Sequence, residues 1–192
     1  MHETEDIELK AIFSTYIHQV KPTNLSNILS LLKKVDIHKG VTSTIWKSDF
    51  NTSIHTNIME EWKEEFTQLL IPDLNTYIDA MNPIYNEYYY NFSIPWVNCY
   101  KEGQYQEVHR HLPYDISYCF YYKMPKNSGT LIFYKEKGDS SFLKKNYNEH
   151  TPNIQEGDLL IFDSSLSHFT SPSKSKEEKI TVAGNIRFNN YE

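Results

Sequence analysis

The sequence predicts a mainly β protein with some α-helix, in which a sandwich or jelly roll of short strands is buttressed by N-terminal helices. Two observations predict this fold class. After residue 85, short runs of β-branched and aromatic residues are separated by turn signals roughly every 8–12 residues. Before that point, apolar residues recur at helical spacing. We therefore expect a single domain over residues 1–192, with a helical buttress at 1–85 and a strand-rich core at 86–192.

Two helices are predicted in the first part of the chain. The segment LSNILSLLKK has helical spacing, and Thr23 and Asn24 precede it as an expected N-cap. A longer helix is predicted from about Asn57 to Ala80, with an interruption near Pro72 because proline lacks a backbone N–H. Its apolar stripe consists of Ile58, Trp62, Phe66, Leu69 and Leu70. Such stripes are packing faces, so both helices should cover a sheet.

Eight short strands are predicted after Asn82-Pro83. They are Tyr88–Ile94, Trp96–Tyr100, Gln106–His111, Ile116–Lys123, Gly129–Tyr134, Asp158–Phe162, Leu166–Thr170 and Lys179–Phe188. In the fourth of these strands two sets of side chains alternate, so one set should pack in the core and the other should face a pocket. The two sets are Tyr118, Phe120 and Tyr122, and Ser117, Cys119 and Tyr121.

Charge and composition exclude several function classes. The formal net charge of −6 offers no basic footprint for a phosphate backbone, so nucleic acid is not expected as a partner. No segment approaches the ~20 apolar residues of a membrane span, and the segment MHETEDIELK is acidic where a signal peptide is basic. We therefore expect a cytosolic protein. Cys99 and Cys119 lie in apolar runs without C-x-x-C spacing, which indicates small buried hydrophobic side chains.

Three histidines indicate a metal site. His109 and His111 are residues i and i+2 of a predicted strand, so their side chains should leave one face about 6.6 Å apart. His168 follows the apolar segment DLLIF and enters from a distant strand. Ligands from non-local strands can surround an ion on three sides, as facial metal sites require. The other five histidines have polar neighbours and are expected at the surface: His2, His18, His38, His55 and His150.

Lys179 adds a positive charge to this group. It precedes the alternating segment ITVAGNIRF, which places a fixed cation deeper in the same barrel. The chain has 19 lysines and arginines, of which only Arg110 and Arg187 are arginines. Because lysine is much more common than arginine in this chain, a lysine is the expected residue at a position that needs a positive charge.

From Trp96 to Asn189, about half of the chain, the sequence resembles the double-stranded β-helix core of Fe(II)/2-oxoglutarate-dependent oxygenases. It is most similar to oxygenases of marine bacteria and cyanophages, and more distantly to prolyl 4-hydroxylases. The matching segments are Y-x-x-G-x5-H-x-H, which begins at Tyr100, then ISYCFYYKMPKNSGTLIF, EGDLLIFDSSLSHFTSP and EEKITVAGN. The resemblance implies a double-stranded β-helix (jelly roll) core, Fe(II) as the metal, 2-oxoglutarate as cosubstrate and O2 as oxidant.

The resemblance also implies the metal ligands. His109 corresponds to the first iron ligand and His168 to the distal histidine. His111 stands where most of these oxygenases carry Asp, which leaves Asp115 as an alternative ligand. Four residues of strand span about 13 Å, so Asp115 would reach the metal only through a sharp bend at Pro113. We therefore expect His111 to be the third ligand.

The resemblance also implies which residues bind the cosubstrate. Lys179 stands where most of these oxygenases carry Arg, the cation that pairs with the distal carboxylate of 2-oxoglutarate. A lysine offers a point charge instead of a bidentate fork. Arg187 has the same strand parity and is the alternative cation. By resemblance, Ser117 and Tyr105 are expected to assist in binding the cosubstrate.

These expectations describe an oxygenase that hydroxylates a C–H bond of an amino acid, a peptide or protein side chain, or a small metabolite. Two alternatives stay open, a cupin-type metalloenzyme that does not use 2-oxoglutarate and a non-catalytic jelly-roll binding module. Ten residues separate Gly157 from His168, whereas the second cupin motif has the form P-x-G-x-x-H, and this spacing favours the oxygenase. The expected site of action is the cytoplasm, which would be that of a host if a phage encodes the protein.

Overall fold

The computed structural model describes residues 15–43, 47, 49–56, 58–81, 89–134 and 149–189. Its helices are α1 (Leu25–Lys34) and α2 (Glu61–Met81). Its strands are β1 (Ile17–Val20), β2 (Thr42–Ser43), β3 (Asn51–Thr52), β4 (Tyr89–Phe92), β5 (Trp96–Tyr100), β6 (Gln106–His109), β7 (Ile116–Lys123), β8 (Leu131–Tyr134), β9 (Glu149–His150), β10 (Leu159–Asp163), β11 (His168–Thr170) and β12 (Lys179–Asn189).

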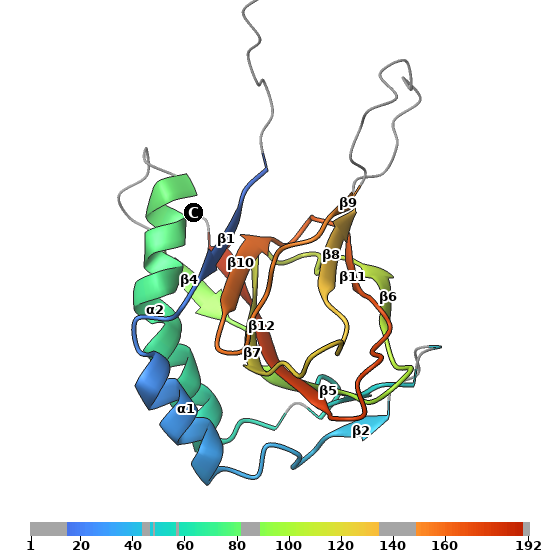
Figure 1. The fold of residues 1–192 in the computed structure, drawn as a ribbon. Coiled ribbons are helices and arrows are strands. Elements are labelled where there is room, and N and C mark those ends of the chain that lie inside the picture. Colours follow the sequence, from blue (N-terminus) through green and yellow to red (C-terminus); the bar gives the residue numbers. More distant parts are fainter. Residues whose placement is uncertain are drawn as a thin grey trace, which may run out of the picture.

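The strands form two antiparallel sheets that face each other around a common interior (Figure 1). The larger sheet has the order β1-β10-β7-β12-β5-β3-β2, and β4 pairs with β12 beside this path. The smaller sheet has the order β6-β11-β8-β9. Apart from the consecutive pairs β2–β3 and β8–β9, neighbouring strands are distant in sequence, which is typical of a jelly roll and brings β6, β11 and β12 around one interior.

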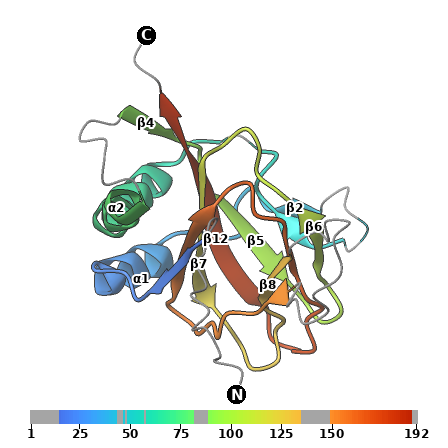
Figure 2. The ribbon, with the colours of Figure 1, turned by 90° about the horizontal axis from the view of Figure 1, so that it is seen from above.

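The two helices cover the outer face of the larger sheet, as Figure 2 shows from above. Ile28 and Leu32 of α1 and Phe66 and Leu70 of α2 are at most 1% exposed and belong to one apolar cluster with the sheet. The ring of Phe66 meets that of Phe120 edge-on, with 5.9 Å between ring centroids. Large buried aromatic contacts of this kind fix the helices to the sheet.

Successive side chains of β7 point to opposite faces of the larger sheet. Tyr118 and Phe120 pack in the cluster beneath the helices. Ser117, Cys119 and Tyr121 face the space between the sheets. A second apolar cluster closes part of that space, and its buried members are Tyr121, Leu131, Phe133, Leu160 and Phe162. The set that faces the interior is therefore the one that begins with Ser117.

All eight predicted strands are present, and the bounds of β5 and β7 agree residue for residue with the prediction. The structure adds the short strands β1, β2, β3 and β9, of which β1 extends the larger sheet by pairing with β10. The first part of the chain thus contributes strands as well as helices. Asn57, Asn82, Pro83 and Tyr88, which bound predicted segments, lie outside the described residues.

The predicted interruption at Pro72 is wrong, because α2 continues through it to Met81. The apolar face continues on both sides of the proline, with Phe66, Leu70 and Leu74 fully buried against the sheet. This packing outweighs the missing backbone hydrogen bond at Pro72. The helix begins at Glu61 instead of Asn57, so Ile58 precedes it and is 48% exposed.

Thr23 and Asn24 join the two helices. Asn24 is the N-cap residue of α1, but its side chain makes no capping hydrogen bond. Its Nδ2 instead donates to the carbonyl of Leu69, at 2.9 Å. The Thr23 hydroxyl donates to Oδ1 of Asp73, at 2.8 Å. The polar side chains expected to cap α1 therefore hold it to α2.

Neither helix in the described part of the chain has the length and apolar character needed to span a membrane.

Candidate active site

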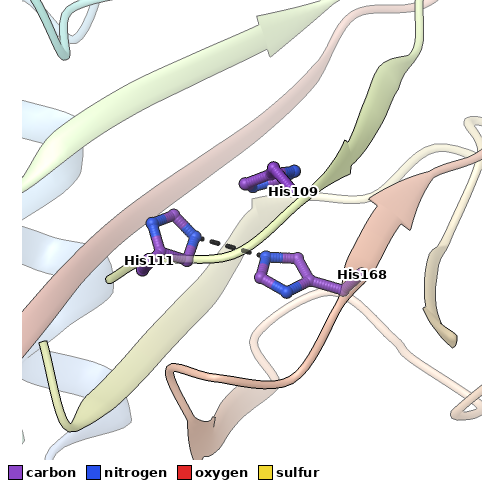
Figure 3. Close-up of side chains that lie close together, drawn as sticks. All are labelled: His109, His111 and His168. Carbon is purple, nitrogen blue, oxygen red and sulfur yellow. Dashed lines mark hydrogen bonds between the residues drawn. The ribbon is translucent and has the colours of Figure 1, made fainter. Parts of the chain in front are cut away.

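The three histidines indicated by the sequence meet inside the barrel (Figure 3). His109 ends β6 and His168 begins β11, and the two residues are directly opposite in the antiparallel pairing of these strands. His111 lies two residues beyond the end of β6, so the predicted strand ends earlier than expected. Its backbone N–H donates to the carbonyl of Ser164, at 3.0 Å, which fixes the segment without a strand.

The imidazole rings point toward one another, and one ring nitrogen from each lies within 4.8 Å of the others. Ring centroids are 4.3 Å apart for His109 and His168, and 4.9 Å apart for His109 and His111. The Nε2 atoms of His111 and His168 are 3.2 Å apart. Side chains from β6, β11 and the segment after β6 therefore converge on one point.

Backbone carbonyls orient two of the rings. Nδ1 of His109 lies 2.8 Å from the carbonyl oxygen of Glu107, and Nδ1 of His168 lies 2.7 Å from that of Leu166. Only a protonated Nδ1 can donate to a carbonyl, so in each neutral ring Nε2 keeps its lone pair. Metal-binding histidines usually donate their other ring N–H to a carbonyl or carboxylate in this way, which fixes the orientation of the ring.

Burial also holds the three rings neutral. It lowers the pKa of His111 and of His168 to about 3, and it lowers that of His109. At neutral pH the site therefore presents lone pairs to a cation instead of three positive charges. Imidazole donors of this kind suit Fe(II) as well as other first-row metals, so the donor set fits the implied iron.

The alternative ligand and the alternative cation lie elsewhere. Asp115 is exposed, and its Oδ2 accepts a hydrogen bond from the backbone N–H of Phe188, at 2.8 Å. Arg187 is exposed near the end of β12, opposite Asn91 of β4. Neither residue lines the pocket around the histidines.

The pocket around the histidines also contains Lys179. Lys179 is 1% exposed, its Nζ lies 4.4 Å above the Tyr100 ring centroid, and it donates to the carbonyl of Gly129 at 3.3 Å. Burial lowers the pKa of Lys179 to about 8, so the ammonium form still predominates at neutral pH. No carboxylate of the described residues pairs with it, which leaves a buried cation suited to an anionic ligand.

Ser117 and Tyr105 differ from each other in position. Ser117 lines the pocket, but its hydroxyl donates to Oδ1 of Asn185 at 2.9 Å and lies 2.7 Å from Oγ of Ser164. Tyr105 is half-buried and does not line the pocket. The structure thus brings Ser117 near the histidines, although with its hydroxyl engaged, and does not bring Tyr105 there.

Tyr100 and Tyr121 both line the pocket. The sequence alone assigns no site role to Tyr100, and it leaves open whether the alternating set that includes Tyr121 faces the pocket. Tyr100 is opposite Lys179 in the pairing of β5 with β12, and its hydroxyl donates to Oε1 of Gln106 at 2.9 Å. The signals that could have found these tyrosines are the Y-x-x-G motif for Tyr100 and the strand parity shared with Ser117 for Tyr121.

Comparisons with known proteins agree with this geometry. Residues 95–185 match the model of a family described as "Putative 2OG-Fe(II) oxygenase". The structure resembles a prolyl-4-hydroxylase from Pseudomonas putida, with 15% identity, a TM-score of 0.62 and coverage of 89% of this chain and 92% of that chain. It also resembles the viral collagen prolyl hydroxylase of Paramecium Bursaria Chlorella virus-1, with 19% identity, a TM-score of 0.57 and coverage of 96% and 97%.

A third similar structure is HygX from Streptomyces hygroscopicus, which contains nickel, 2-oxoglutarate and hygromycin B. It shares 8% identity with this chain at a TM-score of 0.62, over 90% of this chain and 83% of HygX. Curated protein sequences gave no significant match. The structural likenesses confirm the double-stranded β-helix fold. Together with the family match over residues 95–185, just under half of the chain, they show that its strand-rich core is similar to the 2OG-Fe(II) oxygenases, whose cofactors are Fe(II) and 2-oxoglutarate.

Proposed function

We propose that this protein is an Fe(II)- and 2-oxoglutarate-dependent oxygenase that hydroxylates a C–H bond of a peptide or a small molecule. In this proposal His109, His111 and His168 hold Fe(II), and Lys179 holds the distal carboxylate of 2-oxoglutarate. The observation that carries it is that three neutral imidazoles and one buried ammonium, from three different strand regions, line the same pocket.

The residues of the chain have separable tasks in this reaction. When bound, Fe(II) with 2-oxoglutarate and O2 supplies the oxidising power that puts one oxygen atom into the substrate and the other into succinate, with release of CO2. The carbonyls of Glu107 and Leu166 keep the Nε2 atoms of His109 and His168 available to the metal. The ring of Phe162, whose centroid is 5.0 Å from that of His168, gives the pocket an apolar wall beside this ligand.

Charge balance favours a dianionic cosubstrate. Three neutral imidazoles do not compensate the charge of a divalent ion, whereas a ligand set with an Asp supplies one negative charge. Lys179 adds a further positive charge in the same buried pocket. A molecule with one carboxylate for the metal and a second for Lys179 pairs with both cations at once and offsets two of their three positive charges, and 2-oxoglutarate is such a molecule.

Two substrate classes are supported by related structures. A prolyl hydroxylase from Trichoplax adhaerens was solved in complex with a peptide fragment of an oxygen degradation domain. HygX was solved with the small molecule hygromycin B. A panel of proline-containing peptides and small polyhydroxylated molecules therefore covers both classes.

The test is succinate release by the Fe(II)-loaded protein across this panel. We expect one class to stimulate turnover of 2-oxoglutarate, and substrate mass to increase by one oxygen atom. His168→Ala should abolish turnover, since one of the three ligands is removed, whereas His55→Ala at an exposed position should not. Turnover by His168→Ala at the wild-type rate would refute the ligand assignment.

Binding can be tested without a substrate. Titrating the protein with Fe(II) and 2-oxoglutarate in the absence of oxygen should produce a metal-to-cosubstrate charge-transfer band that requires both components. A protein that binds Fe(II) but never shows this band would refute the proposed use of 2-oxoglutarate. Failure to bind any metal would refute the histidine site itself.

A further inference from the structure

Outside the pocket, His38, Cys99 and Glu178 place an imidazole, a thiol and a carboxylate together, and we propose that they form a second metal site, for Zn²⁺ or a similar divalent ion. One potential ligand atom from each residue lies within 4.8 Å of the others. Among the described residues only this group and the three histidines of the pocket cluster in this way. The proposal is independent of the oxygenase reaction.

The ligands come from three separate parts of the chain. His38 lies in the segment between α1 and β2, Cys99 is on β5, and Glu178 directly precedes β12. The pairing of β5 with β12 places Cys99 opposite Ile180, two residues after Glu178. The site thus lies where these two strands run side by side (Figure 1).

Local hydrogen bonds position His38. Oδ1 of Asp36 accepts a hydrogen bond from the backbone N–H of His38 at 3.2 Å, and the carbonyl of His38 accepts one from Val41 at 3.1 Å. The turn is therefore held by its own hydrogen bonds and does not depend on a metal. A site whose ligands are held in place before binding loses less entropy when the ion arrives.

The distances suit a tetrahedral ion. Sγ of Cys99 lies 3.7 Å from Nδ1 of His38. Bond lengths of about 2.3 Å to sulfur and 2.0–2.1 Å to nitrogen separate these two atoms by about 3.6 Å around tetrahedral zinc. Oε2 of Glu178 lies 3.5 Å from the other ring nitrogen, Nε2. The part-exposed Glu178 side chain must therefore shift toward Nδ1 to complete the set, and water would fill the fourth position.

The same three groups could also be a thiol nucleophile with its base and orienting acid, but burial argues against this function. Cys99 is 1% exposed and packs in the core beneath the helices, so no substrate carbon can approach its sulfur. Burial also raises the pKa of Cys99 to about 12, which keeps it a thiol without a metal. An ion can enter from the side of His38, whose side chain is 52% exposed, and the thiol proton then leaves to solvent as the metal–thiolate bond forms.

Cobalt(II) separates this site from the histidine site, because only a thiolate ligand gives an intense near-ultraviolet charge-transfer band. We expect the metal-free full-length protein to bind two equivalents of Co²⁺, and the band to accompany one of them. His168→Ala should remove one equivalent and keep the band. His38→Ala should remove the other equivalent together with the band, and Zn²⁺ should displace the cobalt and abolish the band.

The two cysteines provide a matched pair of variants. Cys99→Ser should abolish the band, whereas Cys119→Ser, which changes the cysteine that lines the pocket, should leave it unchanged. Glu178→Gln should weaken Zn²⁺ binding at this site at least tenfold. A band that survives in Cys99→Ser, or a wild-type protein with one equivalent of metal and no band, would overturn the proposal. His38→Ala changes a half-exposed side chain, so it keeps the test valid if Cys99→Ser folds poorly.

Discussion

A buried lysine without an acidic partner is unfavourable, since desolvation disfavours its charged form. In Lys179 this cost is offset in part by the Tyr100 ring, 4.4 Å from Nζ, and by the carbonyl of Gly129 at 3.3 Å. Neither group neutralises the charge. The pocket therefore keeps an uncompensated ammonium that an incoming carboxylate can pair with, and this gives Lys179 a measurable signature.

Binding of 2-oxoglutarate should depend on the protonation of Lys179. The ammonium is the binding form, and burial lowers its pKa to about 8, so affinity should be constant below pH 7 and weaken as the pH rises above 8. Lys179→Met should weaken binding roughly 10- to 100-fold at pH 7, which corresponds to about 1.5–3 kcal/mol for a charged hydrogen bond. The charge-transfer band, titrated between pH 6.5 and 9.5, measures both effects.

Lys179→Arg is the matched control, because a guanidinium stays protonated throughout this range. Its affinity for 2-oxoglutarate should not change with pH, even if the bulkier side chain lowers it overall. A wild-type affinity that is equally flat up to pH 9.5 would contradict the role given to Lys179.

The histidines should make the metal-free protein sensitive to acid. Burial lowers the pKa of His111 and His168 to about 3, whereas histidines of an unfolded chain titrate near 6.5. Between these values the unfolded chain binds protons that the native protein does not, so stability is highest above pH 6.5 and falls as the pH decreases toward 3. The slope approaches about 1.4 kcal/mol per pH unit for each histidine.

Urea unfolding of the metal-free protein at several pH values between 7.5 and 5 measures this slope. His111→Gln should reduce it, and His55→Gln at an exposed position should not. Identical slopes for the wild type and His111→Gln would show that His111 is not buried in its neutral form.

How far the sequence reveals single residues depends on where their partners lie. His109 and His111 were identified because their spacing of two is visible in the chain, and His168 because it follows an apolar strand. His38 was expected to be a simple surface residue, since its partner Cys99 is 61 positions away and no local pattern connects them. Tyr105 was expected in the pocket, but the β5–β12 register places Tyr100 beside Lys179 instead.

At the level of secondary structure, α2 shows how packing overrides a local preference. Pro72 is exposed and lies within the helix, where it cannot supply an N–H to the carbonyl of Gln68. The Thr76 hydroxyl bonds to the carbonyl of Pro72 at 2.9 Å, but that bond does not replace the missing one. A residue with a backbone N–H would therefore be more favourable than proline at position 72 of the helix.

Pro72→Ala should stabilise the protein by about 1–3 kcal/mol, because alanine restores the missing hydrogen bond and is strongly preferred inside helices. The free energy of unfolding in urea is the measurement. Thr76→Ala, which changes an exposed side chain in the same helix, should alter stability much less. If Pro72→Ala destabilised the protein, the proline would be needed to shape α2 against the sheet.

The strands were predictable because apolar and aromatic runs alternate with turns, and β7 shows this pattern at its clearest. The short strands β2, β3 and β9 have two residues each, which is too few for any period to be recognised. The course of α2 through Pro72 depends on the sheet beneath it, which is information that the helix sequence does not contain. Prediction thus succeeded where the signal is local.

For the whole molecule, the apolar cluster beneath the helices joins the helical part of the chain to the barrel. Phe66 and Leu74 of α2 and Phe120 and Ile161 of the sheet are fully buried in it. The second apolar cluster is not an independent core among the described residues, because it is built partly on strands of the same larger sheet. The expectation of a single domain over residues 1–192 therefore has a physical basis that can be tested directly.

The helices and the barrel should unfold together. Trp62 is in α2 and Trp96 in β5, and both are less than 10% exposed, so each reports on its own part of the molecule. In a background with Trp46→Phe, the variants Trp62→Phe and Trp96→Phe leave one tryptophan each. If the shared apolar cluster couples the two parts, fluorescence of either tryptophan and far-ultraviolet circular dichroism should give coincident urea transitions within each variant. In the Trp96→Phe variant, which keeps only Trp62, a fluorescence transition at lower urea than the circular dichroism transition would contradict this. The chain would then contain two separately unfolding units.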